Sequence, residues 1–580
     1  MIDYGSFERA VGLDWYGVDP DLQAILERLL APEDRTWAVP HLERIGALCG
    51  GPIAERGEVI DKNPPRLERY DRWGEEVNRV VHHPATVASK RDCWESGVTG
   101  ALLEREAERH GRRFPLVLRA ACNYLLSQAD TGLVCATGMT AGVVGLVQRF
   151  ATEPVRSRLL ARLTAERFDD AWDGAMFMTE RTGGSDLSTL TTSARQRDGR
   201  WYLDGFKFFC SNVDAGAIAT LARPEGAAPG LKGVALFVVP RERSDGTPNG
   251  IRIHRLKEKL GTRTVPTGEV DFVDAEAWLL AGEDGSATDG RGINRMMVMV
   301  NESRLGIAAM GLGCMRRAFL EGMVYASHRT AFGHPLVELP LVRETLVRML
   351  VELEAAAALY FAAADAFDRD PALARILVPL TKFRATRGGI ELASQALELH
   401  GGNGYMEDWP TARLLREAQC HTIWEGTENI ICLDVLRALR GEGTAPALLG
   451  RVGTMAHGSG HPELARARAA IADAAARVER QLAAVVGLDR SGAEYRARHL
   501  TARLCAVVQA ALLCEQAEHE LTEHGSARKA VVLELFLARH VAGDMDAAVA
   551  REEEACRTRF APLVGYGRIL PATASVAATG

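Results

Sequence analysis

Apolar residues recur at helical spacing through the first part of the chain. From about residue 101 to residue 167 they fall three and four positions apart, with few β-branched clusters, a pattern that predicts amphipathic helices. Residues 116–150 read as a nearly continuous buried helix, broken where Gly132, Gly138 and Gly142 interrupt the apolar run. This part of the chain is therefore predicted to be helical.

The pattern changes to that of short strands between residues 172 and 273. Residues 201–203 form an aromatic run between glycines, 234–239 a continuous apolar run and 270–273 an alternating one, and all three are typical of β-strands. Glycine and proline gather between residues 224 and 250, where strand connections are required. We predict a small β domain here.

Long helical patterns return further along. Residues 304–328, 341–367 and 374–399 each carry an apolar stripe over many turns, and the last stripe stops at Gly401-Gly402. The composition then shifts to Ala and Arg while apolar residues keep helical spacing. Residues 445–565 are therefore predicted to form a further antiparallel helical unit.

The order of elements predicts the fold class, an α+β multidomain protein. At about 150 residues per domain, the 580 residues allow about four structural units. We expect an N-terminal extension and helical domain over 1–172, a middle β domain over 173–290, a helical bundle over 291–442 and a C-terminal helical extension over 443–580.

Composition narrows the class of protein. With 47% apolar and 25% charged residues and a formal net charge of −7, the chain is typical of folded proteins and unlike disordered or fibrous ones. The sequence contains no run of about 18 apolar residues, so no membrane-spanning helix is expected. Its first nine residues lack the basic and apolar regions of a secretory signal.

Eleven cysteines are scattered singly, without a CxxC pair. This pattern indicates reduced thiols, a cytoplasmic location and no structural zinc site, and no metal ligands are predicted. The sequence also lacks a Walker A loop, the HExxH and GxSxG motifs and a GxGxxG turn after a strand. If the chain is an enzyme, its chemistry must come from another source.

Residues 176–186 hold the densest group of chemically useful side chains. A short apolar run meets hydroxyls, glycines and an acid in the order Met-Phe-Met-Thr-Glu-Arg-Thr-Gly-Gly-Ser-Asp. Glycines permit close backbone approach, and hydroxyls with free amides bind polar rings or phosphates. The same composition fits an ordinary β-turn, so both readings stay open at this point.

Four later segments complete a pattern with this one. They lie at residues 207–212 (Lys-Phe-Phe-Cys-Ser-Asn), 329–333 (Arg-Thr-Ala-Phe-Gly), 399–405 (Leu-His-Gly-Gly-Asn-Gly-Tyr) and 421–429 (His-Thr-Ile-Trp-Glu-Gly-Thr-Glu-Asn). In order and spacing, these motifs resemble the FAD-dependent acyl-CoA dehydrogenase family. Within it, Asn63-Pro64-Pro65 and residues 430–437 resemble the AidB subgroup of the bacterial alkylation response. The likeness covers most of residues 60–440.

The resemblance implies a helical N-terminal domain, a middle β-barrel-like domain and a C-terminal four-helix bundle, to which this chain adds an extra helical unit. It also implies a homotetramer with FAD at a subunit interface. Phe209 and Ser211 occupy the family's Trp-x-Thr position, which keeps the hydroxyl and reduces the aromatic surface, and Arg329 and Phe332 would reach FAD from the neighbouring subunit. The full set of residues implied around FAD is Met178, Thr179, Gly184, Ser185, Phe209, Cys210, Ser211, Arg329, Phe332, Gly402, Trp424, Thr427 and Asn429.

By the same resemblance, Glu425 is the catalytic base. It would remove the proton α to a thioester while a hydride leaves the β-carbon for flavin N5, and its amide would help to bind the thioester oxygen. Burial raises the pKa of a carboxyl, which suits a base; outside such a motif, a Glu before Gly is ordinarily a helix cap or an exposed acid. Some relatives carry the base immediately before an Arg on an earlier helix. Here Ser303 precedes Arg304, and Glu302 is one residue too early and would point to another helix face.

Five neighbouring residues have plainer interpretations. Glu398 stands where the family usually has Gln, and a carboxylate would repel a diphosphate unless it were protonated or turned away. The AidB subgroup shares this Glu, so FAD binding is expected to be retained. His400 and His421 are expected to pack or cap rather than transfer protons, and Tyr405 and Trp409 to be core or interface aromatics.

AidB-like proteins are associated with duplex DNA through a basic C-terminal unit, and phosphate binding requires clustered Lys and Arg. From Gly441 to Gly580 this chain has 16 basic and 16 acidic residues, a balance that does not support DNA binding. Arg437 and Arg440 are the candidate DNA contacts, although solvated helix faces also explain such arginines. A neutral helical extension equally suits oligomer contacts or a membrane surface.

We therefore expect an FAD-dependent acyl-CoA dehydrogenase-type oxidoreductase that desaturates an acyl thioester and passes electrons to an acceptor. Two alternatives stay open. One is a flavin-containing, DNA-binding protective protein with weak dehydrogenase activity, and the other is an acyl-CoA oxidase or a desaturase of acyl groups on a carrier protein.

Overall fold

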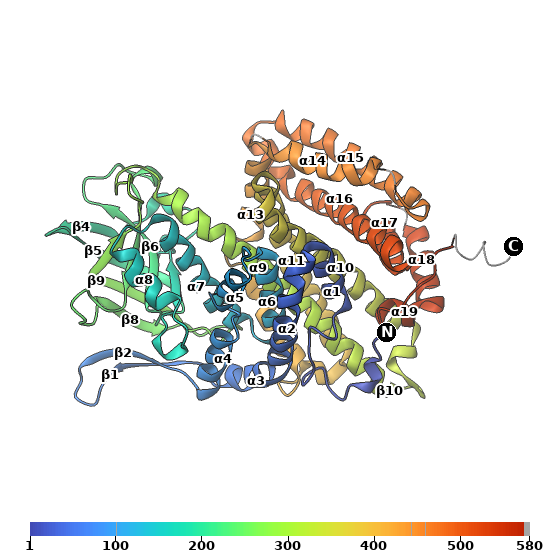
Figure 1. Cartoon of the computed structure of the whole chain (residues 1–580), viewed down its shortest axis with the longest axis horizontal. Helices are drawn as coiled ribbons and strands as arrows, with labels where there is room; N and C mark the ends of the chain where they lie inside the picture. Colours follow the sequence, from blue (N-terminus) through green and yellow to red (C-terminus); the bar gives the residue numbers. More distant parts are fainter. Residues whose placement is uncertain (100, 442, 459, 544, 573–580) are drawn as a thin grey trace. The chain divides into compact units, whose positions relative to one another are not determined.

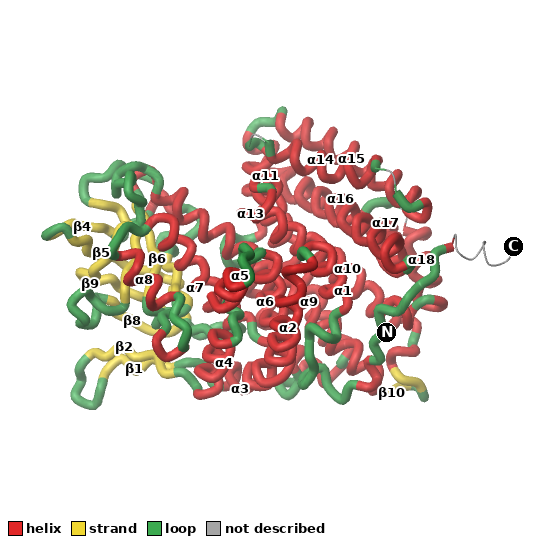
Figure 2. The backbone as a smooth tube through the Cα atoms, in the orientation of Figure 1, coloured by secondary structure: helices red, strands yellow, loops and turns green. Residues whose placement is uncertain are grey.

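The computed structural model describes residues 1–99, 101–441, 443–458, 460–543 and 545–572 (Figures 1 and 2). The chain forms two compact units. The first, called the β unit below, comprises Pro52–Phe114 and Ala129–Gly306; the second, the helical unit, comprises Met1–Gly51, Pro115–Gln128 and Ile307–Gly580. The end of the predicted C-terminal extension, residues 573–580, lies outside the described residues.

The β unit contains both helices and strands (Figure 1). Its helices are α3 (Ala54–Lys62), α4 (Pro84–Glu95), α5 (Ala101–Arg109), α7 (Thr131–Phe150), α8 (Val155–Leu163) and the first part of α9 (Gly292–His328). Its strands are β1 (Arg66–Tyr70), β2 (Glu76–Val81), β3 (Gly174–Phe177), β4 (Ser193–Arg197), β5 (Arg200–Ser211), β6 (Ala217–Pro224), β7 (Ala235–Pro240), β8 (Ile251–Leu256) and β9 (Thr267–Leu279). The three predicted strand patterns lie in β5, β7 and β9 and are confirmed.

Strands β3 to β9 form one sheet of seven strands (Figure 2). The strand order is β3-β6-β4-β5-β9-β7, with β8 paired to β9 and a further pairing of β7 with β6. Because β7 pairs with both β9 and β6, the strands β6, β4, β5, β9 and β7 close on themselves and leave no free edge within the ring. The predicted barrel-like middle domain is confirmed.

The apolar run of β7 is continuous because the strand has a hydrophobic core on each face. Leu236 and Val238 pack into a cluster that includes residues of α7 and α8. The alternate residues Phe237 and Val239 point into the interior of the barrel. Side chains alternate between the two faces of a strand, so two cores require an unbroken apolar sequence.

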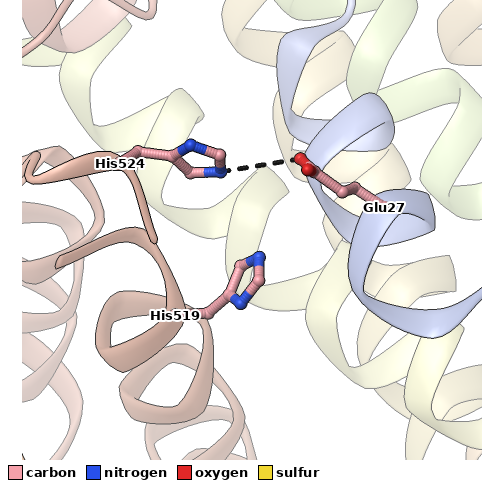
Figure 3. Close-up of side chains that lie close together, drawn as sticks. All are labelled: Glu27, His519 and His524. Atoms are coloured by element: carbon pink, nitrogen blue, oxygen red, sulfur yellow. Dashed lines mark ion pairs between the residues drawn. The ribbon is translucent and has the colours of Figure 1, made fainter. Parts of the chain in front are cut away.

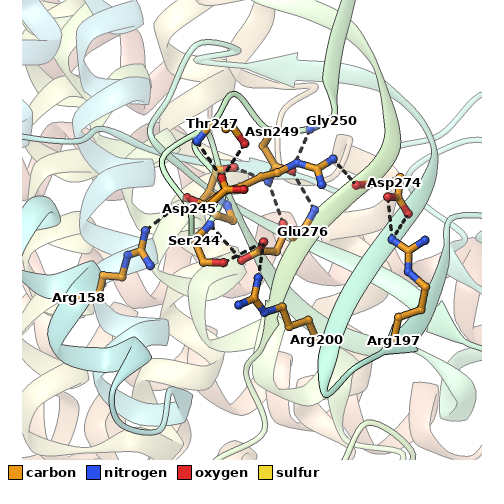
Figure 4. A network of polar contacts seen from close by, with 12 residues as sticks. Arg158, Arg197, Arg200, Ser244, Asp245, Thr247, Asn249, Gly250, Asp274 and Glu276 are labelled. Carbon is orange, nitrogen blue, oxygen red and sulfur yellow. Dashed lines mark hydrogen bonds and ion pairs between the residues drawn. The ribbon is translucent and has the colours of Figure 1, made fainter.

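A polar network fixes the connection between β7 and β8 (Figure 4). The Asn249 amide donates to the carbonyls of Pro240 (2.8 Å) and Glu276 (2.9 Å), and its oxygen accepts from the Glu276 backbone amide at 2.8 Å. The buried Glu276 carboxylate accepts from the Ser244 amide at 3.2 Å and the Ser244 hydroxyl at 3.1 Å. Each buried polar group therefore has a partner, which holds this loop against β9.

The helical stretch over residues 116–150 breaks at a different place from the predicted one. The break lies at Asp130, whose carboxylate accepts from the Leu133 amide at 3.0 Å and caps α7. The glycines that were expected to break the helix lie inside α7. At Gly142 a Cβ atom would lie 2.7 Å from Met299 Cγ, so this glycine serves close packing against α9 rather than a turn.

The hairpin of β1 and β2 has no counterpart in the sequence prediction. Both strands are mostly half-buried or exposed and rich in charged residues, so they show no clean alternation. Leu67 and Val80 nevertheless pack against the barrel interior cluster, and the Asn78 side chain accepts from the Ile253 amide of β8 at 3.2 Å.

The helical unit is built from long helices (Figure 1). They are α1 (Pro20–Leu29), α2 (Pro32–Leu48), α6 (Leu116–Ala129), the remainder of α9, α10 (Pro340–Arg369), α11 (Pro371–Leu399), α12 (Pro410–His421), α13 (Glu428–Leu439), α14 (Thr444–His457), α15 (Ala465–Val486), α16 (Arg490–His524), α17 (Arg528–His540), α18 (Met545–Thr558) and α19 (Phe560–Val564), with a short hairpin of β10 (Thr330–Ala331) and β11 (His334–Pro335). The long helices predicted over 304–328, 341–367 and 374–399 are confirmed as parts of α9, α10 and α11. The helices after residue 443 belong to the same compact unit as this bundle.

Two helices, Thr131–Phe150 and Arg490–His524, are long and apolar enough to cross a membrane by length and composition. The most apolar windows of these helices are 67% and 78% buried inside the protein. Both therefore have the surroundings of core helices, because their apolar faces are already covered.

Four charged residues, called the interior ion cluster below, join distant parts of the helical unit. They are Asp21 of α1, Glu354 of α10, and Arg528 and Lys529 at the start of α17, and all four are buried. Lys529 pairs with both carboxylates, and Arg528 pairs with Glu354. Although burial alone raises the pKa of Glu354, Arg528 and Lys529 hold it well below its usual range. Removing one partner of such a buried pair strongly destabilises the folded protein, because it leaves a buried charge without its counter-charge.

Candidate functional site

The predicted cofactor residues fall into two groups on the two units. Residues 178–185 and 209–211 belong to the β unit, and residues 329–332 and 402–429 belong to the helical unit. Each group is described within its own unit.

In the β unit, the segment after β3 is anchored by the buried carboxylate of Glu180. It accepts from the amide (2.7 Å) and hydroxyl (2.6 Å) of Thr191 and from the Thr192 amide (3.0 Å). The ammonium of Lys207 on β5 lies 3.0 Å from the same carboxylate and also donates to the Leu221 carbonyl at 3.0 Å. The loop is thus tied to two strands by fully satisfied polar groups.

The pKa values of both Glu180 and Lys207 are shifted in this buried ion pair. Burial alone would raise the pKa of Glu180. Lys207 and the hydrogen bonds from the two threonines outweigh this effect and lower the pKa to about 2. Burial also lowers the pKa of Lys207, and the nearby carboxylate opposes that effect. Glu180 is therefore a fixed anion that positions the loop, not a proton carrier.

The glycines of this loop make a tight turn. The amide of Glu180 donates to the Gly183 carbonyl at 3.3 Å, and the Gly183 amide donates back at 3.0 Å. Gly183 has φ of +125°, and a Cβ on Gly184 would lie 2.4 Å from the Thr179 hydroxyl oxygen. The β-turn reading of the sequence is therefore correct, and the turn leaves Gly184 and Ser185 exposed, which also keeps the ligand-binding reading open.

The end of β5 presents alternating side chains. Phe209 is 54% exposed, and the Lys257 ammonium lies 4.5 Å from its ring centre. Cys210 is buried in the barrel interior cluster, so only its backbone could face a ligand. The Ser211 hydroxyl lies 3.1 Å from the Thr267 hydroxyl. An exposed aromatic and a hydroxyl therefore stand two residues apart, as the resemblance implies.

In the helical unit, Arg329 and Phe332 belong to the β10–β11 hairpin. Phe332 is 90% exposed and has φ of +54°, and Gly333 follows with φ of +83°. Two successive left-handed residues form the turn of a two-residue hairpin. A bulky residue in this conformation is strained, and its exposure leaves the ring available to another molecule.

The loop after α11 contains Gly402 and the predicted packing histidine. Gly402 is exposed, and the neighbouring Glu398 is exposed on α11. His400 is buried, stacks on Tyr325 with ring centres 4.1 Å apart and lies 2.7 Å from the Ala396 carbonyl through Nδ1. Burial lowers its pKa. His400 therefore packs and ends α11 as predicted.

Two predicted aromatics behave differently in this loop. Trp409 packs edge-on against Tyr325 at 5.5 Å between ring centres. Tyr405 is 75% exposed, so it is not a core residue within the described chain.

Glu425 lies in the turn between α12 and α13. It is half-buried, and its backbone has φ of +54°, in the left-handed region. The buried Lys382 of α11 donates to the carbonyl of the next residue, Gly426, at 2.6 Å. Strained non-glycine residues of this kind cluster at functional sites, and Lys382 holds this one in place.

The turn is closed by a buried histidine and an aromatic. His421 ends α12, is fully buried, and has neither ring nitrogen hydrogen-bonded within the described residues. Burial, with a smaller effect of Lys382, lowers its pKa to about 3, so it is a neutral packing residue as predicted. Trp424 is half-buried and follows in the same turn.

Residues 427–429 begin α13 and contact the C-terminal extension. Thr427 is the N-cap residue of α13, and Asn429 is exposed. Arg498 of α16 donates to the Asn429 side chain and pairs with Glu428, which Arg387 of α11 also contacts at 2.5 Å. The extension thus reaches Asn429, one of the residues implied around FAD.

The candidate DNA contacts lie further along α13. Arg437 is exposed and lies 3.0 Å from Asp434. Asp434 also forms a two-pronged pair with Arg375, at 3.0 and 2.8 Å. Arg440 is exposed at the end of α13. The single negative charge of Asp434 is shared by two arginines, so it balances the charge of Arg437 only in part.

Three positioning residues were not predicted from the sequence: Lys207, Lys382 and Arg498. Lys207 opens a motif that we singled out for its aromatic and hydroxyl residues. Lys382 and Arg498 lie 44 and 69 residues from their partners in the chain, and no local pattern marks such pairs.

Three profiles of known protein families match successive segments of the chain. The profile of the acyl-CoA dehydrogenase middle domain matches residues 175–275, and that of the acyl-CoA dehydrogenase C-terminal domain matches residues 290–440. The profile of the adaptive response protein AidB N-terminal domain matches residues 7–170.

Individual relatives extend the likeness over most of the chain. AidB of Escherichia coli (strain K12) is 36% identical over 423 residues, 70% of this chain and 75% of that protein. Acyl-CoA dehydrogenase family member 11 of Caenorhabditis elegans is 32% identical over 74% of this chain and 71% of its own. The crystal structure of Caenorhabditis elegans ACDH-11 in complex with C11-CoA is similar with a TM-score of 0.84 and 28% identity, covering 97% of this chain and 98% of that one.

Proposed function

Because the chain belongs to the acyl-CoA dehydrogenase family of FAD-dependent oxidoreductases, we propose that Glu425 is its catalytic base and that its substrate is an acyl-CoA. The observation that supports this role is the conformation of Glu425: the residue is half-buried, and its backbone is in the left-handed region. Such strain persists only where the surrounding structure imposes it.

The residues present fit a bound flavin. In the β unit, the Gly183–Gly184 turn offers exposed backbone, Phe209 an exposed ring and Ser211 a hydroxyl. In the helical unit, the residues next to Glu425 in the sequence include Trp424, Thr427 and Asn429. An exposed hairpin of the same unit carries Arg329 and Phe332. A flavin needs an aromatic cover, polar contacts to its ring and donors for its diphosphate, and these side chains supply each of them.

The chemistry divides between cofactor and chain. FAD, when bound, supplies the acceptor for the hydride that leaves the substrate β-carbon. The carboxylate of Glu425 would take the proton from the α-carbon, and its backbone amide would donate to the thioester oxygen, where negative charge develops. Lys382 would act as a positioning residue, since it binds the Gly426 carbonyl and so holds the backbone of the turn that carries Glu425.

Several finer properties belong to the same proposal. The C11-CoA bound by the Caenorhabditis elegans protein favours coenzyme A as the carrier. The exposed Phe332 favours a homotetramer in which this ring meets a neighbouring subunit. All eleven cysteines are free thiols, which supports a cytoplasmic location, and the electrons would pass to a separate acceptor protein.

An anaerobic titration of the holoprotein tests the substrate class. Short, branched and long acyl-CoAs would be added in turn while the oxidised flavin absorbance is followed. We expect rapid, stoichiometric bleaching by one class of acyl-CoA. A protein with intact FAD that no acyl-CoA reduces would contradict the proposed substrate and favour a carrier-bound acyl group.

A second function is suggested by the match to the AidB N-terminal domain, namely the DNA-binding protective role. It stays a prediction, because Arg437 is already paired with Asp434. Duplex binding that weakens with salt and is reduced by Arg437→Ala would support it. Binding that is unchanged in this variant would remove Arg437 as the contact.

A further inference from the structure

Two helices of the helical unit bring together a glutamate and two histidines (Figure 3). Glu27 lies near the end of α1, and His519 and His524 lie in the last turns of α16. One ligand atom of each residue lies within 4.8 Å of the others. Figure 3 shows both imidazole rings on the side of α16 that faces α1, with the Glu27 carboxylate opposite them.

The contacts within this group are loose for hydrogen bonds. His524 Nε2 lies 3.5 Å from a Glu27 oxygen, and the other Glu27 oxygen lies 3.6 Å from Arg35. The two imidazole rings stand almost perpendicular, at 87°, with centres 5.7 Å apart. At these distances the three side chains are not held together by direct hydrogen bonds.

His519 provides an independent sign that this site binds a partner from outside the chain. Its Nε2 atom is shielded from solvent and has no hydrogen-bond partner within the described residues. A buried nitrogen that is left without a partner destabilises the fold. Binding an ion would remove this destabilisation, because neutral imidazole is a common ligand of divalent metals.

The two helices are held in register without any ion. Glu515 lies one turn before His519 on α16, and it pairs with Arg28, the residue after Glu27. Arg451 of α14 pairs with Glu515 as well. Since residues four apart share a helix face, these pairs keep the ligands of α1 and α16 opposite each other.

We propose that Glu27, His519 and His524 form a binding site for a divalent transition-metal ion, with Zn²⁺ as the ion that the ligands fit best. Two imidazoles and one carboxylate suit Zn²⁺, whereas Mg²⁺ and Ca²⁺ prefer oxygen ligands. With metal–ligand distances near 2.1 Å, a tetrahedral site needs ligand atoms about 3.4 Å apart, so small side-chain rotations must bring them inward. Water would fill the fourth position, because Glu27 and His524 are half-exposed.

The site would clip the C-terminal extension to the N-terminal segment. Its ligands are separated by nearly the whole chain, so no sequence motif marks it, and the scattered cysteines play no part. An ion that binds only the folded chain stabilises it by mass action. The proposal does not depend on the flavin chemistry.

Zinc titration of the metal-free, tag-free holoprotein tests this site. We expect one tightly bound equivalent of Zn²⁺ by calorimetry and a rise in melting temperature. In His519→Ala and His524→Ala the affinity should fall at least about tenfold, and the thermal shift at a fixed zinc concentration should shrink accordingly. His499→Ala is the matched control, because His499 is an exposed histidine on the same helix and its loss should change neither quantity.

Co²⁺ provides a second readout, since a tetrahedral site gives intense visible absorption and an octahedral surface site does not. Glu27→Gln, which keeps both histidines, should weaken this Co²⁺ absorption band. This variant also tests the site if a histidine variant fails to fold. Zinc binding equal in wild type, His519→Ala and Glu27→Gln would overturn the proposal. The proposal would also be overturned if the wild-type protein bound its tightest equivalent of Zn²⁺ no more tightly than His519→Ala binds its own.

Discussion

Inside the helical unit, charged residues are used in two opposite ways. In the interior ion cluster, Asp21 and Glu354 are buried and each is paired with one or two cations. In the turn after α12, Glu425 is half-buried and its backbone is held at φ of +54°. The carboxylates of the cluster are paired within the chain, whereas the turn holds the backbone of a glutamate in a strained conformation.

This difference separates structural from catalytic charge. A buried ion pair offsets its desolvation only through its partners. Arg528 and Lys529 keep Glu354 ionised, whereas burial raises the pKa of Asp21 to about 6. Together the four residues join α1, α10 and α17. A strained residue costs about 1–3 kcal/mol and persists only if neighbours impose it; at Glu425 the neighbour is Lys382, through the Gly426 carbonyl. Substitutions in the cluster should therefore change stability, and those in the turn should change the reaction.

The largest change in stability is expected for Glu354→Gln. It leaves the positive charges of Arg528 and Lys529 with a single buried carboxylate, Asp21, and should lower the free energy of unfolding by about 4 kcal/mol. Chemical denaturation of the holoprotein measures this loss. Flavin reduction in the protein that remains folded should be unchanged; a selective loss of reduction rate would break the distinction between cluster and turn.

Glu180→Gln should lower the free energy of unfolding by about 3 kcal/mol at pH 7, because it unpairs Lys207. The folded pKa of Glu180 is about 2, below its usual 4.5, so its stabilisation is complete above about pH 4.5 and is lost as the pH falls toward 2. Unfolding of wild type and variant across this range should show the gap closing. The double variant Glu180→Gln/Lys207→Met should recover part of the loss at pH 7, and a gap independent of pH would contradict the ion pair.

Lys382→Met should slow flavin reduction by about tenfold, a change of about 1.4 kcal/mol in the barrier. The variant loses the 2.6 Å bond to the Gly426 carbonyl, so Glu425 would be less well placed. Stopped-flow reduction at saturating substrate, compared with melting temperature, separates this effect from simple destabilisation. A variant that melts earlier yet reduces its flavin at the wild-type rate would show that Lys382 only supports the fold.

The smallest effect is expected for Arg498→Ala. Its contacts to Glu428 and Asn429 are partly exposed, so the free energy of unfolding should change by less than about 1 kcal/mol. If Asn429 binds the flavin diphosphate, FAD should dissociate faster from this variant during gel filtration. Arg496→Ala, at an exposed position on the same helix, is the control and should retain FAD fully.

Periodicity in the sequence predicted the long helices and the strands β5, β7 and β9, because burial on one or two faces imposes a pattern that can be read locally. It did not predict the β1–β2 hairpin, whose strands are charged and mostly half-buried or exposed. It also misplaced the break before α7, since Gly142 is there for packing against Met299 and Asp130 supplies the cap.

The candidate site was predicted through the resemblance of five motifs, not through physical pattern alone. What the sequence could not reveal was the geometry that makes these residues unusual. The left-handed backbone of Phe332 and Glu425, and the pairing of Lys382 with a residue 44 positions away, depend on tertiary packing. The ligands of the proposed metal site are further apart still.

Single-turnover flavin reduction in Glu425→Gln tests the assignment of the base most directly. With the acyl-CoA that bleaches the wild type, the variant should bind FAD and substrate normally and reduce its flavin about 10³-fold more slowly, since general-base catalysis contributes about 10²–10⁴. Glu302→Gln, which removes the nearest acid to the alternative base position, should react at the wild-type rate. Reduction of Glu425→Gln at the wild-type rate would contradict the role of Glu425.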